Sequence, residues 1–174
     1  MLNLTTEQFN LQYHEIPDTR EGYSQVQLIG QNGSTWQRTL SAPTSIVPTL
    51  LFSRNHAQAY IVYGFNIFAL DIYSGDILWQ YHVDEPVWAS YLIKGKDLLL
   101  HLELSIIYLN AHGDLQWHFD HNEVITQVTI QNGAFQSPLG KISLWQTLFS
   151  RQRLAIQDFE GRSFMLELAS GAIL

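Results

Sequence analysis

Alternating and continuous hydrophobic patterns both indicate β-strands in this chain. Within a predicted strand at residues 8–16, hydrophobic and polar positions alternate over 9–14 (FNLQYH), which is the period of a half-buried strand. Residues 59–63 (AYIVY) and 98–102 (LLLHL) are almost wholly apolar and rich in strand-forming residues, as inner strands are. The spacing typical of a helical solenoid, with apolar residues at i, i+3, i+4 and i+7, is missing from the segments that repeat below. The pattern predicts an all-β protein.

A short motif repeats along the chain. Residues 67–81 read IFALDIYSGDILWQY and residues 107–119 read IYLNAHGDLQWHF, and in both a Trp follows a Gly by four residues. A weaker copy places Trp36 three residues after Gly33, and a fourth, FMLELASGAIL, includes Gly171. The glycine-to-glycine intervals are 42 (33 to 75), 38 (75 to 113) and 58 (113 to 171).

Each copy of the motif predicts a β-hairpin. Ser74-Gly75 and Asn32-Gly33 supply the positive φ that tight hairpin turns need, and the Trp segment is the returning strand. A period of about 40 residues is the spacing of four-stranded blades packed face to face, with each Trp between neighbouring sheets.

The segment 64–81, GFNIFALDIYSGDILWQY, resembles the quinoprotein-type (PQQ-type) β-propeller repeat, in which a strand ending in ALD leads through a Gly turn into a Trp strand. The resemblance spans residues 24–130 and 160–174. It implies antiparallel, four-stranded blades that form a partial or small propeller-like stack of about three to four repeats. A half-propeller, a barrel-like stack and an open fan all fit this number of repeats. No ligand of the family's quinone cofactor carries over to this chain, so no cofactor is expected.

The repeats suggest one domain over residues 1–174. The expected units are 24–64, 65–103, 104–159 and 160–174, and the predicted strand at 8–16 is expected to pair with the last unit. The longest interval contains 131–153. There, residues 141–153 have the spacing of a short helix, although ISLWQTLF within them is nearly as good a strand.

Composition narrows the function. The chain has no cysteine, which excludes disulfides, Cys-ligated zinc and a thiol nucleophile. Sixteen acids against nine Lys and Arg give a net charge of −7, which disfavours nucleic acid as a partner. The N-terminal residues show no basic region followed by an apolar run, and no long uncharged apolar stretch occurs, so we expect a cytoplasmic protein without membrane contact.

Catalytic motifs are missing from the sequence. It contains no G-x-S-x-G, no Gly-rich phosphate loop and no H-E-x-x-H. His118, Asp120 and His121 lie within four residues and could hold a cation, but a polar strand end beside a Trp explains them better. His101 is interpreted as a hydrogen-bonded core or interface histidine. We therefore expect no enzyme activity and no metal site.

The negative charge is concentrated in the two best repeats. Residues 66–123 contain nine acids and two lysines, a sum of −7, whereas the rest of the chain sums to zero. Asp84, Glu85, Asp120 and Glu123 follow the Trp strands by three to six residues, so stacked blades would gather these acids on one rim. Trp88, His118 and His121 lie nearby as contact residues. A solvated face that only keeps the protein soluble is the competing interpretation.

These features predict a non-enzymatic protein-binding module whose acidic surface engages a basic protein partner. One concrete form is an immunity or inhibitor protein that neutralises a basic toxin such as a nuclease. Two alternatives stay open. One is a diverged propeller fragment that scaffolds a larger assembly, and the other is a metal-dependent hydrolase around His118, Asp120 and His121.

Overall fold

The computed structural model describes residues 3–6, 9–16, 20, 23–32, 34–42, 47–53, 57–132 and 152–174. These residues form β-strands, turns and bends and include no helix, so the predicted all-β fold class is confirmed. It follows that none of the described segments is a helix long and apolar enough to span a membrane.

The strands form four antiparallel sheets, each made from strands that are consecutive in sequence, and we call these sheets blades 1 to 4. Blade 1 contains β1 (Asn3–Thr6), β2 (Phe9–Ile16), β3 (Ser24–Asn32) and β4 (Ser34–Ala42). Blade 2 contains β5 (Thr49–Ser53), β6 (Gln58–Tyr63), β7 (Asn66–Asp71) and β8 (Ile77–His82). Blade 3 contains β9 (Val87–Ile93), β10 (Asp97–Leu102), β11 (Ser105–Leu109) and β12 (Leu115–Asp120). Blade 4 contains β13 (Ile125–Asn132), β14 (Gln152–Asp158) and β15 (Ser163–Glu167).

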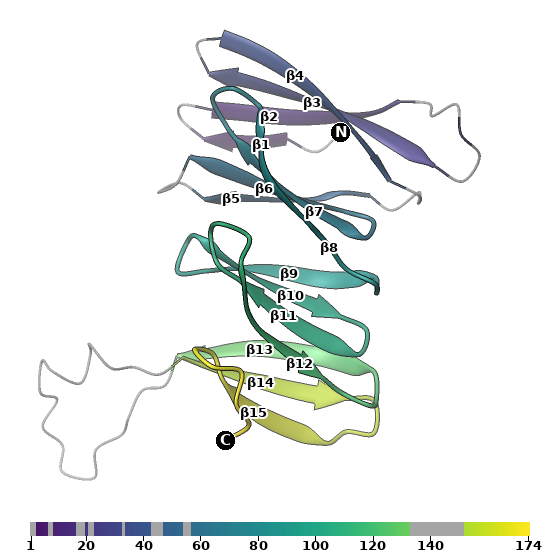
Figure 1. Cartoon of the computed structure of the whole chain (residues 1–174), viewed down its shortest axis with the longest axis vertical. Helices are drawn as coiled ribbons and strands as arrows, with labels where there is room; N and C mark the ends of the chain where they lie inside the picture. Colours follow the sequence, from purple (N-terminus) through teal and green to yellow (C-terminus); the bar gives the residue numbers. More distant parts are fainter. Residues whose placement is uncertain are drawn as a thin grey trace, which may run out of the picture.

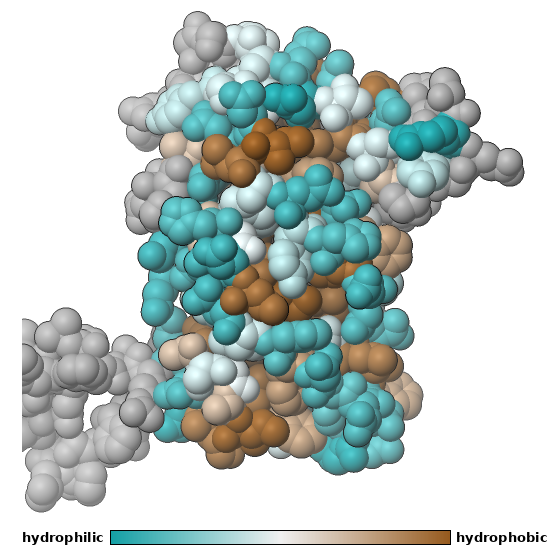
Figure 2. All heavy atoms as spheres, in the orientation of Figure 1, coloured by the Kyte–Doolittle hydropathy of each residue, from teal (hydrophilic) through white to brown (hydrophobic). Residues whose placement is uncertain are grey.

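The blades follow one another along the long axis of the molecule as an open stack (Figure 1). Blade 4 has three named strands, and the start of a fourth appears where Ile173 bridges to Leu166 and Leu174 N–H donates to Met165 O at 2.8 Å. Figure 2 shows that on one side of the stack the apolar side chains lie in separate groups divided by polar ones.

One apolar cluster fills each junction between blades. Residues that alternate along a strand point to opposite faces. In β6, Ile61 therefore joins the cluster shared with blade 1, while Tyr60 joins the cluster shared with blade 3. In β10, Leu98 likewise faces blade 2 and Leu99 faces blade 4. The core is thus divided among the junctions, and the inner blades contribute to two clusters each.

The tryptophans of the repeat join each blade to the next. The indole N–H of Trp79 on β8 donates to Ala111 O at 3.0 Å, and a Cβ built on Gly113 would lie 2.7 Å from the Trp79 ring. Glycine is required there because the turn combines a φ of +83° with direct contact to the indole. The same arrangement joins Trp36 to Ile72 O (2.7 Å) over Gly75, and Trp117 to Leu168 O (2.9 Å) over Gly171.

The N-terminal strand does not pair with the last unit, so that prediction was wrong. β2 instead pairs with β1 on one side and with β3 on the other, and it belongs to blade 1. The reason is local, because a strand that is adjacent in sequence forms a hairpin at lower entropic cost than a distant partner.

The sheets also differ from the expected units 24–64, 65–103, 104–159 and 160–174, because the hydrogen-bonded blades begin at residues 3, 49, 87 and 125. The repeated motif lies at the turn between the third and fourth strands of a blade, and it therefore does not reveal where the first strand starts. The helix considered at 141–153 lies outside the described residues, except that Gln152 and Arg153 begin β14.

Candidate interaction edge

Antiparallel strand order gives the stack two long edges. One, the linker edge, collects the inter-blade linkers and the turns between second and third strands of blades 2 to 4 (residues 64–65, 82–86, 103–104, 120–124 and 158–162). The opposite, glycine edge collects the turns that hold the repeat glycines, together with the lysine turn (residues 71–76, 94–97, 110–114 and 167–172). The two edges lie on opposite sides of the stack in Figure 1.

The four acids singled out from the sequence all belong to the linker edge, although they do not share one role. The Asp84 side chain is fully exposed, and its Oδ1 lies 3.9 Å from His82 Nε2. Glu85, by contrast, accepts hydrogen bonds from Leu104 N–H (2.7 Å) and from Ser105 Oγ (3.2 Å). Glu85 therefore ties the linker before blade 3 to the β10–β11 turn.

His118, Asp120 and His121 do not come together as a metal centre. His118 Nε2 lies 3.0 Å from Asp120 Oδ1 on the exposed surface of β12, whereas His121 turns to Asp158 of blade 4. Within the described part of the chain, no group of three His, Asp or Glu side chains is arranged to hold a metal ion. Glu123 is half-buried on the same linker as His121.

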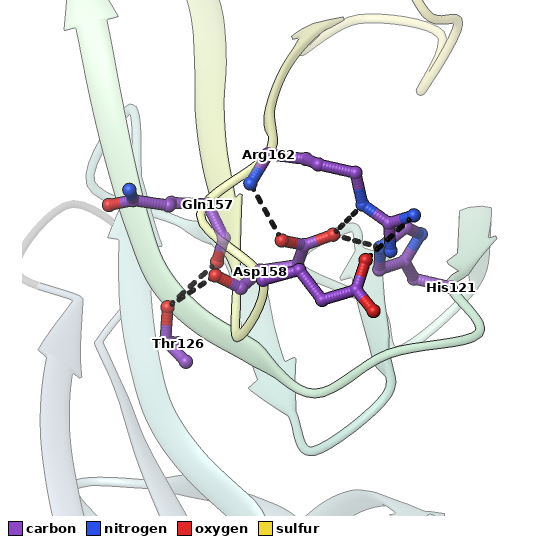
Figure 3. A network of polar contacts seen from close by, with 6 residues as sticks. His121, Thr126, Gln157, Asp158 and Arg162 are labelled. Atoms are coloured by element: carbon purple, nitrogen blue, oxygen red, sulfur yellow. Dashed lines mark hydrogen bonds and ion pairs between the residues drawn. The ribbon is translucent and has the colours of Figure 1, made fainter.

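A polar network centred on Asp158 connects that linker to blade 4 (Figure 3). The buried Asp158 carboxylate accepts hydrogen bonds from the Arg162 backbone N–H (2.8 Å) and Arg162 Nε (2.7 Å), and His121 Nε2 lies 3.1 Å away. Burial opposes ionisation of this carboxyl group, but the contacts with His121 and Arg162 outweigh it and lower the pKa of Asp158 to about 2. Arg162 also pairs with Glu160 at 3.2 Å. The network holds the β14–β15 turn in place.

Trp88 lies at the start of β9, close to the linker edge, and is 51% exposed. Its ring centroid is 5.9 Å from that of His101, whose Nε2 lies 2.8 Å from Ile125 O. Burial lowers the pKa of His101, although its contact with the Ile125 carbonyl acts in the opposite direction. His101 is therefore a junction residue between blades 3 and 4, while Trp88 presents an exposed ring to solvent.

The apolar residues of the linker edge were not predicted from the sequence. Leu104 is 39% exposed and Phe159 is 77% exposed, each within a turn between second and third strands. Both are held by linker residues, because Leu104 O accepts from His121 N–H (2.9 Å) and Phe159 N–H donates to Val124 O (2.9 Å). In the sequence, each of these residues is an apolar residue next to acids, in ELS (103–105) and DFEG (158–161), and this pattern could have indicated an exposed contact residue. Their position beside the linkers, however, depends on tertiary contacts.

The linker edge is the more acidic of the two. Its residues include seven acids and one arginine, a sum of −6, whereas the glycine edge has five acids and two lysines, a sum of −3. Two acids of the glycine edge hold turns: Asp71 Oδ1 accepts from Tyr73 N–H in its own turn, and Asp97 accepts from Tyr108 OH and from Ala111 N–H of the β11–β12 turn. Both edges carry exposed acids and exposed apolar side chains, such as Asp76 and Tyr73 on the glycine edge, so the linker edge differs in its larger net negative charge.

No known protein family matches the sequence, and no curated protein matches it either. Solved structures do match. BamB from Moraxella catarrhalis has a TM-score of 0.57 at 18% identity, and the match covers 100% of this chain and 46% of that one. Sqt1 from Saccharomyces cerevisiae has a TM-score of 0.56 at 12% identity, with 90% of this chain and 44% of that one covered. BBS1N, solved in complex with ARL6DN, has a TM-score of 0.51 at 11% identity, with coverages of 93% and 52%.

The chain spans about half the length of these structures. At such low identity the similarity concerns the fold alone, and these neighbours are β-propeller proteins. Four antiparallel sheets in an open stack, joined by tryptophans, thus have the fold of β-propeller blades.

Proposed function

We propose that this chain is a protein-interaction module that binds a basic partner protein through the linker edge. The observation that carries the proposal is the net charge of −6 on the linker edge, together with the exposed side chains of Leu104, Phe159 and Trp88 on or beside it. Acidic rims steer a basic partner, while exposed aromatic residues supply apolar contact area. The solved complex of the similar BBS1N with ARL6DN is consistent with a binding role for such a fold.

The acids to test are those that accept no hydrogen bond from the backbone of a turn. Asp84, Asp120 and Glu160 have exposed side chains, whereas Glu85 and Asp158 hold turns in place and would confound a binding assay. The triple variant Asp84→Asn, Asp120→Asn, Glu160→Gln raises the net charge by three. A control variant, Gln116→Lys, Thr129→Lys, Gln131→Lys, raises it equally at exposed positions away from the linker edge.

The experiment recovers partners with immobilised wild-type protein and then measures their association with each variant by surface plasmon resonance. At low salt the edge variant should associate about tenfold more slowly and the control variant much less so, and the difference should shrink at high salt. Equal slowing by both variants would show that only net charge matters, and no slowing by the edge variant would remove the proposal.

A finer form of the proposal is an inhibitor that covers a basic toxin, such as a nuclease. The small size, the net charge of −7 and the missing catalytic motifs support it. A toxin gene next to this one, together with loss of the toxin's activity on adding the purified chain, is the expected outcome. We also infer that the repeat is of the quinoprotein type, on the strength of the ALD strand and the Gly-to-Trp spacing of residues 69–79.

A further inference from the structure

The two central strands of blade 2 and of blade 3 are buried on both faces, whereas the fourth strands β8 and β12 have exposed residues. Every residue of β10 and β11 is buried, as are the residues of β6 and β7 apart from Gln58, Asn66 and Asp71. Such strands read as continuous apolar runs because a neighbouring blade covers each face. This is the pattern that a blade shows when blades lie on both of its sides.

Blade 4 has a different pattern, with one apolar and one polar face. Val128, Leu154, Ile156 and Leu166 point into the cluster shared with blade 3. The alternate residues point away from it and are mostly polar. Two polar rows cross β13, β14 and β15 in that order. One row is Gln127, Gln157 and Ser163, and the other is Gln131, Arg153 and Glu167. Thr129, Arg153, Gln157 and Ser163 are exposed.

Blade 1 shows the same division at the other end of the stack. Val26, Leu28 and Leu40 point into the cluster shared with blade 2. Gln27 and Gln37 point the other way, with Gln27 Nε2 donating to Gln37 Oε1 at 3.5 Å, and Thr39 lies opposite Gln27. Glutamine and threonine therefore recur on the outer faces of both end blades.

We infer that the outer faces of blades 1 and 4 are capping faces, and that two copies of this chain do not join through them into a closed ring. A further blade packed on either face would bury glutamine, threonine and charged side chains. Burying polar groups without hydrogen-bond partners costs free energy. Repeat arrays need such polar outer faces at their ends to stay soluble. The two edges of the stack, unlike these faces, stay open to partners.

The test compares adjacent residues on opposite faces of one strand. Thr129→Lys adds a charge to the outer face of β13, and Val128→Lys adds the same charge to the inner face. We expect Thr129→Lys to shift the melting temperature by less than about 2 °C, as at an exposed site, and Val128→Lys to lower it by more than about 8 °C. Gln37→Lys provides the equivalent test on blade 1.

The solution mass, measured by light scattering over a range of concentrations, completes the test. A mass of 20.0 kDa, that of one chain, supports the inference. A dimer that persists in Thr129→Lys and in Gln37→Lys also supports it, because the contact must then lie elsewhere. A dimer that either of these variants dissociates, or a large loss of melting temperature in Thr129→Lys, would overturn it.

Discussion

Gly113 and Gly161 allow the free-energy cost of a left-handed backbone to be measured apart from the cost of a contact with an indole ring. Gly113 and Gly161 have φ values of +83° and +82°, but a Cβ would lie 2.7 Å from the Trp79 ring at Gly113 and would meet nothing within 4 Å at Gly161. We expect Gly161→Ala to cost about 1–2 kcal/mol from the left-handed backbone alone. Gly113→Ala should cost a further 1–3 kcal/mol, roughly, because Trp79 must move. Urea unfolding measures both, and equal losses would contradict the indole contact.

Asp158 predicts a dependence of stability on pH. Its pKa is lowered from 3.8 to about 2 in the folded protein, so its ionised form stabilises the fold above about pH 4, and that stability is lost as the pH falls through about 2. Asp158→Asn lacks the charge that pairs with Arg162. The melting temperature of wild type should therefore exceed that of Asp158→Asn near pH 7, and the gap should narrow between pH 4 and pH 2.

Asp84→Asn is the control for this measurement, since the Asp84 side chain is fully exposed. It should show little difference from wild type at any pH. A gap for Asp158→Asn that stays constant down to pH 2 would mean that the carboxylate is not what stabilises the turn.

At the level of single strands, the Trp→Phe substitution should reduce stability much more on β12 than on β9. Trp117 on β12 is buried and donates to Leu168 O of the next blade, whereas Trp88 on β9 is half-exposed. Trp117→Phe leaves that carbonyl without its donor and leaves space in the junction, so we expect a loss of about 2–4 kcal/mol in the free energy of unfolding. Trp88→Phe should change it by about 0.5 kcal/mol or less. Chemical denaturation compares the two, and a similar loss for both would argue against docking between blades.

Element types were largely predictable, and element partners were not. The apolar runs at 59–63 and 98–102 coincide with β6 and β10, and the Gly-Trp motif coincides with the hairpins β7–β8 and β11–β12. The strand at 8–16 was predicted from its alternation, but the prediction of its partner was wrong. Alternation shows that one face of a strand is buried, and it does not show which strand pairs with it.

At the scale of the whole molecule, the division of the core predicts a gradient of protection. Blades 2 and 3 contribute to two apolar clusters each, while blade 4 contributes to one. In a repeat stack, stability is roughly a sum of neighbour contacts, so blade 4 should open more often than the blades between the ends. Hydrogen exchange should show slower exchange for the amides of β6, β7, β10 and β11 than for those of β14 and β15. Uniform protection would mean that the stack unfolds as one unit.

The strands at 8–16, 59–63 and 98–102, the turn glycines and the tryptophans that follow them could be predicted from the residues alone, as could the location of the net charge in residues 66–123. These are properties of neighbouring residues, set by strand alternation and by the positive φ of tight turns. Which acids hold turns and which face solvent depends instead on contacts between segments that are distant in the sequence. Glu85 bonds to a turn 19 residues away and Asp158 lies against a histidine 37 residues away, and such contacts depend on how blades stack. The acids of the predicted rim lie on the linker edge, where Asp84, Asp120 and Glu160 are exposed together with Phe159.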